Sequence, residues 1–138
     1  MTRPILLDTC AAIWLMADEA LSATAVDAID QASDMRQAIY VSPFTAWEVG
    51  LLVARGRLPL AVTPLTWFNA LTSQDLVELA DLTPEILIAS SSLPGTPPND
   101  PADRIIIATA RQQGMMVMTR DRLILGYADA GHVGAIAC

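Results

Sequence analysis

The chain has 138 residues and a formal net charge of −7, with fifteen acidic residues against eight basic ones. So acidic a chain does not bind nucleic acid through its overall charge, and any contact with RNA must come from local arginines and from metal ions that neutralise carboxylates. All eight basic residues are arginine, which excludes enzymes whose chemistry needs a lysine.

The size and the hydropathy of the chain favour a single domain over residues 1–138. Hydrophobic residues make up 53% of the sequence, but charged residues interrupt every apolar run before it reaches the ~18 residues needed to span a bilayer. Two cysteines, Cys10 and Cys138, do not form a disulfide framework. We therefore expect a cytoplasmic protein with free thiols and no membrane partner, whose surplus apolar surface serves a dimer interface or another protein.

The predicted elements alternate between short strands and helices. Serine or threonine followed by proline marks three helix starts, where the first residue caps the helix and the proline occupies its first turn. On the helix that Ser22 caps, we expect Val26, Ile29 and Met35 to form the apolar side. In chain order the predictions are a strand at 5–7, helices at 11–17 and from 22 to about 37, a strand at 39–41, helices at 43–55 and 64–73, a strand at 76–79, helices at 84–92 and 101–113, a strand at 115–118, a helix at 122–127 and a strand at 132–136. This alternation predicts an α/β layered fold around a mainly parallel sheet.

Two aspartates follow predicted strands directly. Asp8 comes after the run 5–7, and Asp121 lies just past the run 115–118. In open parallel sheets, ligands bind beyond the carboxyl ends of the strands, at the point where the strand order reverses. If these two strands are neighbours at that point, the two carboxylates face each other across the crevice.

Glu48 lies on the apolar stripe of its predicted helix. Phe44 and Leu52 stand one turn before and after it, and Trp47 and Leu51 complete the stripe. A carboxylate that faces the interior is costly unless a cation or a hydrogen-bond donor meets it. The pattern therefore predicts that Glu48 is either strained or paired.

Asp103 lies in the first turn of its predicted helix, three residues after Asp100. Several carboxylates brought close together cannot all stay ionised without a counter-charge, and a hard divalent ion such as Mg²⁺ or Mn²⁺ supplies one. Such an ion can activate water and stabilise in-line displacement at a phosphodiester, with no serine or cysteine nucleophile. Cys10 has no histidine placed to activate it.

Each acid also has a purely structural interpretation. Asp8 and Asp100 could act as helix caps, and Asp103 could complement a helix dipole. Glu48 could be an ordinary solvated helix residue, and Asp121 could be a turn residue.

The neighbouring polar residues likewise leave two interpretations open. Arg104, Arg120 and Arg122 flank the acids and could bind phosphates, although Arg104 could instead pair with a nearby carboxylate. The hydroxyls of Thr9 and Thr119 could support metal-bound water and substrate, or could serve only as caps.

Taken together, four stretches resemble the PIN-domain ribonucleases, in particular the toxin components of VapBC toxin–antitoxin pairs. They are ILLDTCAAIWLMA (5–17), SPFTAWEVGLLVARGRL (42–58), NDPADRIIIATAR (99–111) and VMTRDRLIL (117–125). The resemblance implies an α/β/α sandwich, Mg²⁺- or Mn²⁺-dependent endoribonuclease activity, a homodimer, and inhibition by a small VapB-type antitoxin that covers the acidic pocket. The residues at the acidic positions of the family are Asp8, Glu48, Asp103 and Asp121. Leu123 departs from the lysine that is common at its position, which reduces the local positive charge.

Other classes fit less well. A haloacid-dehalogenase-type phosphatase needs a second acid where this chain has Cys10, and both that class and response-regulator receivers need a lysine. A catalytically degenerate PIN-like interaction module remains the alternative, and the presence of all four acids favours the enzyme.

Overall fold

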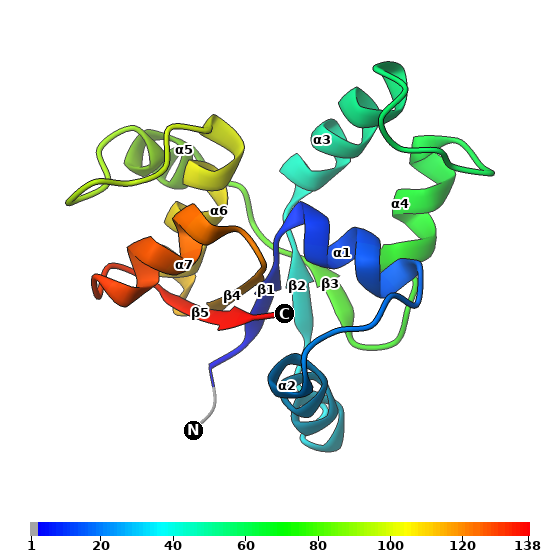
Figure 1. Ribbon diagram of the computed structural model, residues 1–138, viewed down its shortest axis with the longest axis horizontal. Coiled ribbons are helices and arrows are strands. Elements are labelled where there is room, and N and C mark those ends of the chain that lie inside the picture. The colour runs from blue at the N-terminus through cyan, green and yellow to red at the C-terminus, as the bar shows by residue number, and fades with distance from the viewer. Residues whose placement is uncertain (1–2) are drawn as a thin grey trace.

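The computed structural model describes residues 3–138, and its centre is a parallel sheet of five strands (Figure 1). The strands are shorter than six residues each, and every neighbouring pair is parallel. Their order across the sheet is β3-β2-β1-β4-β5. The bounds are Ile5–Leu7 (β1), Ile39–Val41 (β2), Val77–Leu79 (β3), Met116–Thr119 (β4) and Gly134–Ala137 (β5).

Seven helices connect and flank these strands in the described part of the chain. In Figure 1, α5, α6 and α7 lie to the left of the sheet, α3 and α4 to the right, and α2 below. Their bounds are Thr9–Met16 (α1), Ala23–Asp34 (α2), Pro43–Ala54 (α3), Pro64–Thr72 (α4), Pro84–Ser90 (α5), Pro101–Gln113 (α6) and Arg122–Asp129 (α7). All twelve predicted elements are present, with ends displaced by up to three residues.

The cap-then-proline patterns start helices as predicted. Ser42, Thr63 and Thr83 cap α3, α4 and α5, and each side chain accepts a backbone hydrogen bond from the first turn. At the other end of α6, Gly114 takes the left-handed conformation, with a φ of 69°, that favours glycine at a helix terminus.

Two apolar layers cover the sheet, which confirms the predicted α/β/α sandwich. Ile5 and Leu7 of β1 point into one layer, together with α1, α2 and α4. Leu6 points to the other face and packs with α6 and α7. Because side chains alternate along a strand, one continuously apolar run serves both layers. Within residues 3–138, no helix is long and apolar enough to cross a membrane.

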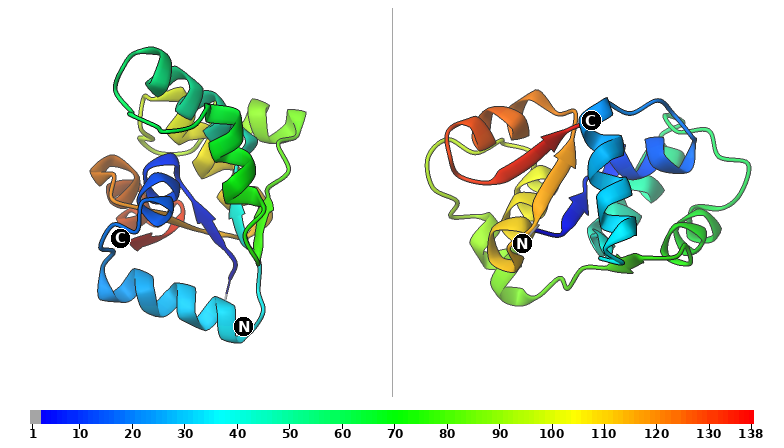
Figure 2. Two further views of the ribbon diagram at one scale, coloured as in Figure 1. Left: turned by 90° about the vertical axis from the view of Figure 1, so that its right-hand side faces the viewer. Right: turned by 90° about the horizontal axis from the view of Figure 1, so that it is seen from below.

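The predicted apolar side of α2 is partly wrong. Met35 is the C-cap and is 53% exposed, and Val26 is 43% exposed. The buried residues of α2 are instead Ala25 and Ala32, while Ile29 is partly buried. Small side chains let the helix approach the sheet closely, so the contact surface lies where the hydropathy pattern is weakest. Figure 2 shows α2 on its own side of the molecule, away from α6.

The strand order reverses between β1 and β4. The chain passes from β1 outward to β2 and β3, then returns to place β4 on the other side of β1. Leu7 is paired with Met118, so both strands end at the same edge of the sheet. The strands that precede Asp8 and Asp121 are therefore neighbours where the strand order reverses, as the sequence-based prediction requires. The residues that follow both strands lie at this topological switch point.

Candidate active site

Asp8 links the ends of the two central strands. Its Oδ1 caps α1 by accepting from the amide of Ala11 at 2.8 Å, and its Oδ2 accepts from the hydroxyl of Thr119 at 2.5 Å. The side chain is buried, and this burial raises its pKa; the bonds from Thr119 and Ala11 lower the pKa, and the charge of Asp121 raises it. Asp8 is thus both a cap and a member of an acidic cluster.

Asp121 is tied to Asp8 through the same threonine. The amide of Asp121 donates to Thr119 Oγ1 at 2.9 Å, while that hydroxyl donates onward to Asp8. Asp121 Oδ1 caps α7 by accepting from the amides of Leu123 and Ile124, at 2.8 and 3.0 Å. The structural alternative for Asp121 was a turn residue before this helix. The side chain is in fact the helix cap, which occupies only one of its two carboxylate oxygens.

Glu48 is paired, as predicted, though its surroundings differ from the expectation. Thr9 donates a short hydrogen bond to Glu48 Oε1, and Thr9 Oγ1 lies 3.1 Å from Thr45 Oγ1. Burial raises the pKa of Glu48; the bond from Thr9 lowers it, and the charges of Asp100 and Asp8 raise it.

The apolar stripe of α3 does not face the core. Trp47 is 58% exposed, whereas Thr45 and Val49, on the other side of the helix, are fully buried. The prediction of an interior stripe is wrong because α3 is apolar on two sides, and the side with the smaller residues packs inward. Glu48 consequently lies half-buried, at the border between the core and an open hollow.

Asp103 has the most perturbed carboxyl of the cluster. Its pKa is raised to about 7, first by burial and then by the charges of Asp100, Asp121, Glu48 and Asp8, in that order. Asp100 caps α6 by accepting from the amides of Ala102 and Asp103 at 2.7 and 3.4 Å.

The four predicted acids, joined by Asp100, form one electrostatically coupled cluster. The pKa of Asp103 is raised by each of the other four acids. The pKa of the Cys10 thiol is raised to about 11, first by desolvation and then by Asp8, Glu48, Asp103 and Asp121. No arginine is among the groups that shift the pKa of Asp8, Glu48 or Asp103. The cluster thus concentrates negative charge that no cationic side chain offsets, and Cys10 is a protonated thiol at neutral pH.

These carboxylates are neighbours but do not converge on one point. Among residues 3–138, no three side chains of histidine, cysteine, aspartate or glutamate stand close enough to chelate an ion as they lie. Mg²⁺ needs only one or two direct carboxylates, because it usually keeps several of its waters. The donor set, which is all oxygen and excess negative charge, fits such an ion.

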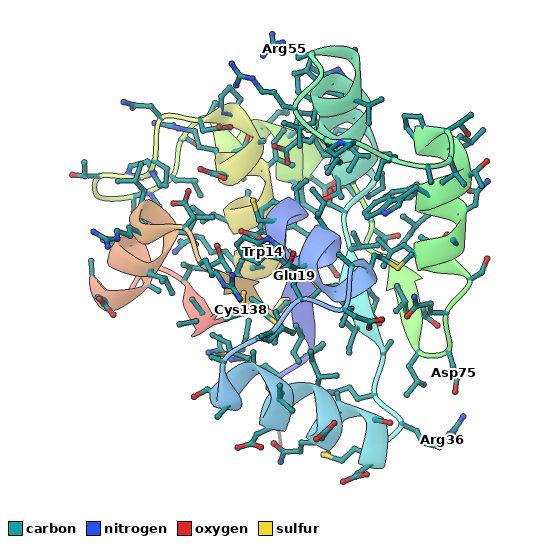
Figure 3. All side chains as sticks on the ribbon, turned by 45° about the vertical axis from the view of Figure 1, so that its right-hand side comes forward. Trp14, Glu19, Arg36, Arg55, Asp75 and Cys138 are labelled. Carbon is teal, nitrogen blue, oxygen red and sulfur yellow. The ribbon has the colours of Figure 1, made fainter. Side chains whose placement is uncertain are left out.

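The three predicted phosphate-binding arginines have different surroundings. Arg120 donates to the carbonyls of Cys138 and Ala20, at 2.7 and 2.6 Å, and its guanidinium lies 3.9 Å from the ring centroid of Trp14. Trp14 and Cys138, which both contact Arg120, lie close together near the centre of the view in Figure 3. Arg120 is therefore engaged in holding the end of the chain against α1.

Arg104 and Arg122 differ from Arg120. Arg104 donates to the carbonyl of Pro98 at 2.7 Å, and Arg122 is exposed in the first turn of α7, directly after Asp121. Within residues 3–138, Arg104 is bonded to a backbone carbonyl and forms no ion pair with a carboxylate. Sequence reasoning missed Thr45, whose partner lies 36 residues away and leaves no local pattern.

Comparisons with known proteins identify the family of this chain. Residues 5–129 match the PIN domain family. Over 119 residues the chain is 34% identical to Ribonuclease VapC22 of Mycobacterium tuberculosis (strain ATCC 25618 / H37Rv), covering 86% of this chain and 87% of that protein. The chain belongs to the PIN-domain family, which is a family of nucleases.

Solved structures share the fold. One chain of VapBC2 from Rickettsia felis, bound to a DNA fragment from its promoter, superposes with a TM-score of 0.67 at 10% identity, covering 96% of this chain and 97% of that one. A chain of DNA-bound VapBC from Salmonella typhimurium superposes with a TM-score of 0.66 at 17% identity, covering 99% and 98%. Within its family, then, the chain is a homologue of the VapC ribonucleases.

Proposed function

We propose that this chain is a Mg²⁺- or Mn²⁺-dependent endoribonuclease toxin whose catalytic and metal-binding residues are Asp8, Glu48, Asp103 and Asp121. The observation that carries the proposal is the gathering of these acids into one coupled cluster at the switch point of the sheet. Homology to a VapC ribonuclease supports RNA as the substrate.

A divalent ion held by these carboxylates would activate water and stabilise the charge that develops on the scissile phosphate. Nucleases of this family generally depend on such a metal. The unbalanced negative charge of the cluster favours the ion, because a divalent cation would stabilise the charged form of Asp103, whose pKa burial and neighbouring carboxylates raise. The oxygen ligands suit Mg²⁺ and Mn²⁺ about equally.

The other polar residues would orient the site. Thr119 holds Asp8 and the start of α7 in one arrangement, and Thr9 holds Glu48. The arginines proposed to contact substrate phosphates are Arg122 and Arg104. Arg120 would contribute to substrate binding only indirectly, because its donors already serve backbone carbonyls.

The partner proposed for this toxin is a VapB-type antitoxin. Structures with this fold were solved as VapBC and FitAcB assemblies, which supports an antitoxin partner. We also propose a homodimer, since large apolar side chains such as Leu65, Ile88 and Leu123 are more than half exposed. Action on RNA in the cytoplasm agrees with the free thiols of Cys10 and Cys138.

Cleavage of a labelled single-stranded RNA, with Mn²⁺ or with EDTA, tests the enzyme. We expect the wild type to cleave only with metal, and Asp8→Asn to lose at least a hundredfold in rate. Asp30→Asn, an exposed acid on α2, is the control that keeps the rate. If Asp8→Asn cleaves as fast as the wild type, the assigned site is wrong. A folded wild type that binds its antitoxin but cleaves no RNA would instead favour the degenerate interaction module.

A further inference from the structure

An apolar hollow of about 400 Å³ adjoins the acidic cluster. One wall is the outward stripe of α3, and the other is the start of α6, which packs against α3. The residues that line the hollow include Phe44, Trp47, Glu48, Leu51, Asp100 and Pro101. The core takes the opposite side of α3, and on the outward stripe Trp47 is exposed while Phe44 and Leu51 are half-buried.

The exposed indole of Trp47 is held as a platform. Its ring centroid lies 5.1 Å from that of Phe44, at an interplanar angle of 31°. Trp47 is 58% exposed, so a large apolar surface is in contact with water. A ligand stacked on the ring would remove that surface from water, which favours binding. The contact with Phe44 fixes the ring, so a ligand would not have to order it.

The hollow is continuous with the candidate active site. Glu48 belongs to the acidic cluster and also lines the hollow, and so does Asp100, whose charge raises the pKa of Glu48 and Asp103. A group bound beside Trp47 therefore lies next to whatever the carboxylates act on. The exposed Arg55 lines the hollow two turns further along α3, roughly 12 Å from Trp47 at 1.5 Å per residue. Figure 3 shows Arg55 at the outer end of that helix.

This order of groups matches the order of groups in a polynucleotide. The acidic cluster would take the scissile phosphate, the aromatic platform an adjacent base, and Arg55 a more distant phosphate. Bases bind well to aromatic side chains only when they are unstacked, which requires a single strand or a loop.

We propose that the hollow between α3 and the start of α6 binds an unpaired nucleobase of the RNA substrate, stacked on Trp47 beside the scissile phosphate. The subsite rests on the ribonuclease proposed above and adds to it the side chain that would hold a base next to the scissile phosphate. Trp47 thereby contributes binding and positioning, and takes no part in the chemistry.

Equilibrium binding separates this subsite from the catalytic assignment. The probes are a uridine hexanucleotide and a hexamer of the same backbone without bases, titrated in the Asp8→Asn background so that the RNA stays intact. We expect Trp47→Ala to weaken uridine hexamer binding about tenfold and to leave binding of the abasic hexamer unchanged. Trp47→Phe should keep most of the affinity. Met35→Ala, which removes a similarly exposed side chain at the end of α2, should keep all of it.

Tryptophan fluorescence provides the second readout. Trp67 is buried and Trp14 lies under Arg120, so a base that stacks in the hollow should quench Trp47 alone. The quenching should be present with the uridine hexamer and absent in the Trp47→Phe variant.

Affinity of Trp47→Ala for the uridine hexamer that is unchanged from that of the Asp8→Asn parent would overturn the subsite. A second result would also overturn it: Trp47→Ala changes the oligomeric state in sedimentation, and RNA does not quench Trp47 in the parent protein. In that case a second copy of the chain would cover the hollow. Failure of the catalytic assignment would be seen separately, as cleavage of the hexamer by the Asp8→Asn protein on a gel.

Discussion

The hydroxyl of Thr119 donates a 2.5 Å hydrogen bond to Asp8 Oδ2, although 111 residues separate the two in the chain. The hydroxyl oxygen of Thr119 also accepts a hydrogen bond from the amide of Asp121, at 2.9 Å. One buried threonine thus fixes the relative positions of two acids that follow neighbouring strands, and it stabilises the charged form of Asp8.

Replacing Thr119 with valine should shift the pH dependence of cleavage. Loss of a hydrogen bond to the ionised carboxylate raises the pKa of Asp8 further, so the rising limb of the pH–rate profile should move about one pH unit upward. Thr109→Val is the matched control, because Thr109 is also fully buried but bonds only the carbonyl of Ile105. An unchanged profile in Thr119→Val would show that this bond does not tune Asp8.

Thr45 should act as a positioning residue for Glu48. The hydroxyl of Thr9 has one proton and donates it to Glu48, so Thr45 must be the donor in the Thr45–Thr9 contact. We expect Thr45→Val to lower the free energy of unfolding by about 1 kcal/mol and kcat severalfold, with little change in KM. Thr45→Ser, which keeps the hydroxyl, should restore kcat. A valine variant with wild-type kcat would show that Thr9 orients Glu48 unaided.

Asp103 should make the metal-free protein less stable as the pH rises. Its pKa is raised from 3.8 to about 7 in the folded chain, so the native state binds the proton more tightly than the unfolded state. The stabilisation is complete below about pH 4 and is lost as the pH rises through about 7. Melting in EDTA from pH 4 to 8 should show this loss, and Asp103→Asn should reduce it and melt a few degrees higher at pH 8. Asp27→Asn, an exposed acid on α2, should behave as the wild type. A pH dependence that survives unchanged in Asp103→Asn would contradict this origin.

Arg120 should matter for stability more than for RNA binding. Arg120→Ala removes two hydrogen bonds to backbone carbonyls and the contact with Trp14, and should cost about 1–2 kcal/mol in urea unfolding. Arg122→Ala should leave stability unchanged and weaken RNA binding with a shallower salt dependence. If instead Arg120→Ala weakens RNA binding and leaves stability unchanged, Arg120 is a phosphate ligand.

The strand ends and the helix starts could be predicted from sequence because both depend on neighbouring residues. An apolar run followed by Asp8 specifies a buried strand and a cap, and Ser42-Pro43 specifies a helix start. The side of α3 that packs inward could not be predicted, because its apolar residues lie on two faces and the choice depends on the space left beside β1. The role of Arg120 and the contact of Thr45 with Thr9 depend on residues distant in the chain, which no local pattern records. That residues 1–138 form one domain stays a prediction.

The most direct test of a shared cation site is a thermal melt of the apo protein during titration with Mn²⁺. Wild type should gain about 2.7 kcal/mol at a metal concentration one hundred times the Kd, and Asp8→Asn and Asp103→Asn should each lose most of that gain. The double variant should lose little more than either single one, because both carboxylates serve one ion. Asp129→Asn, an exposed acid at the end of α7, should respond as the wild type. A wild type that does not respond to Mn²⁺, or an Asp8→Asn protein that responds fully, would contradict the site.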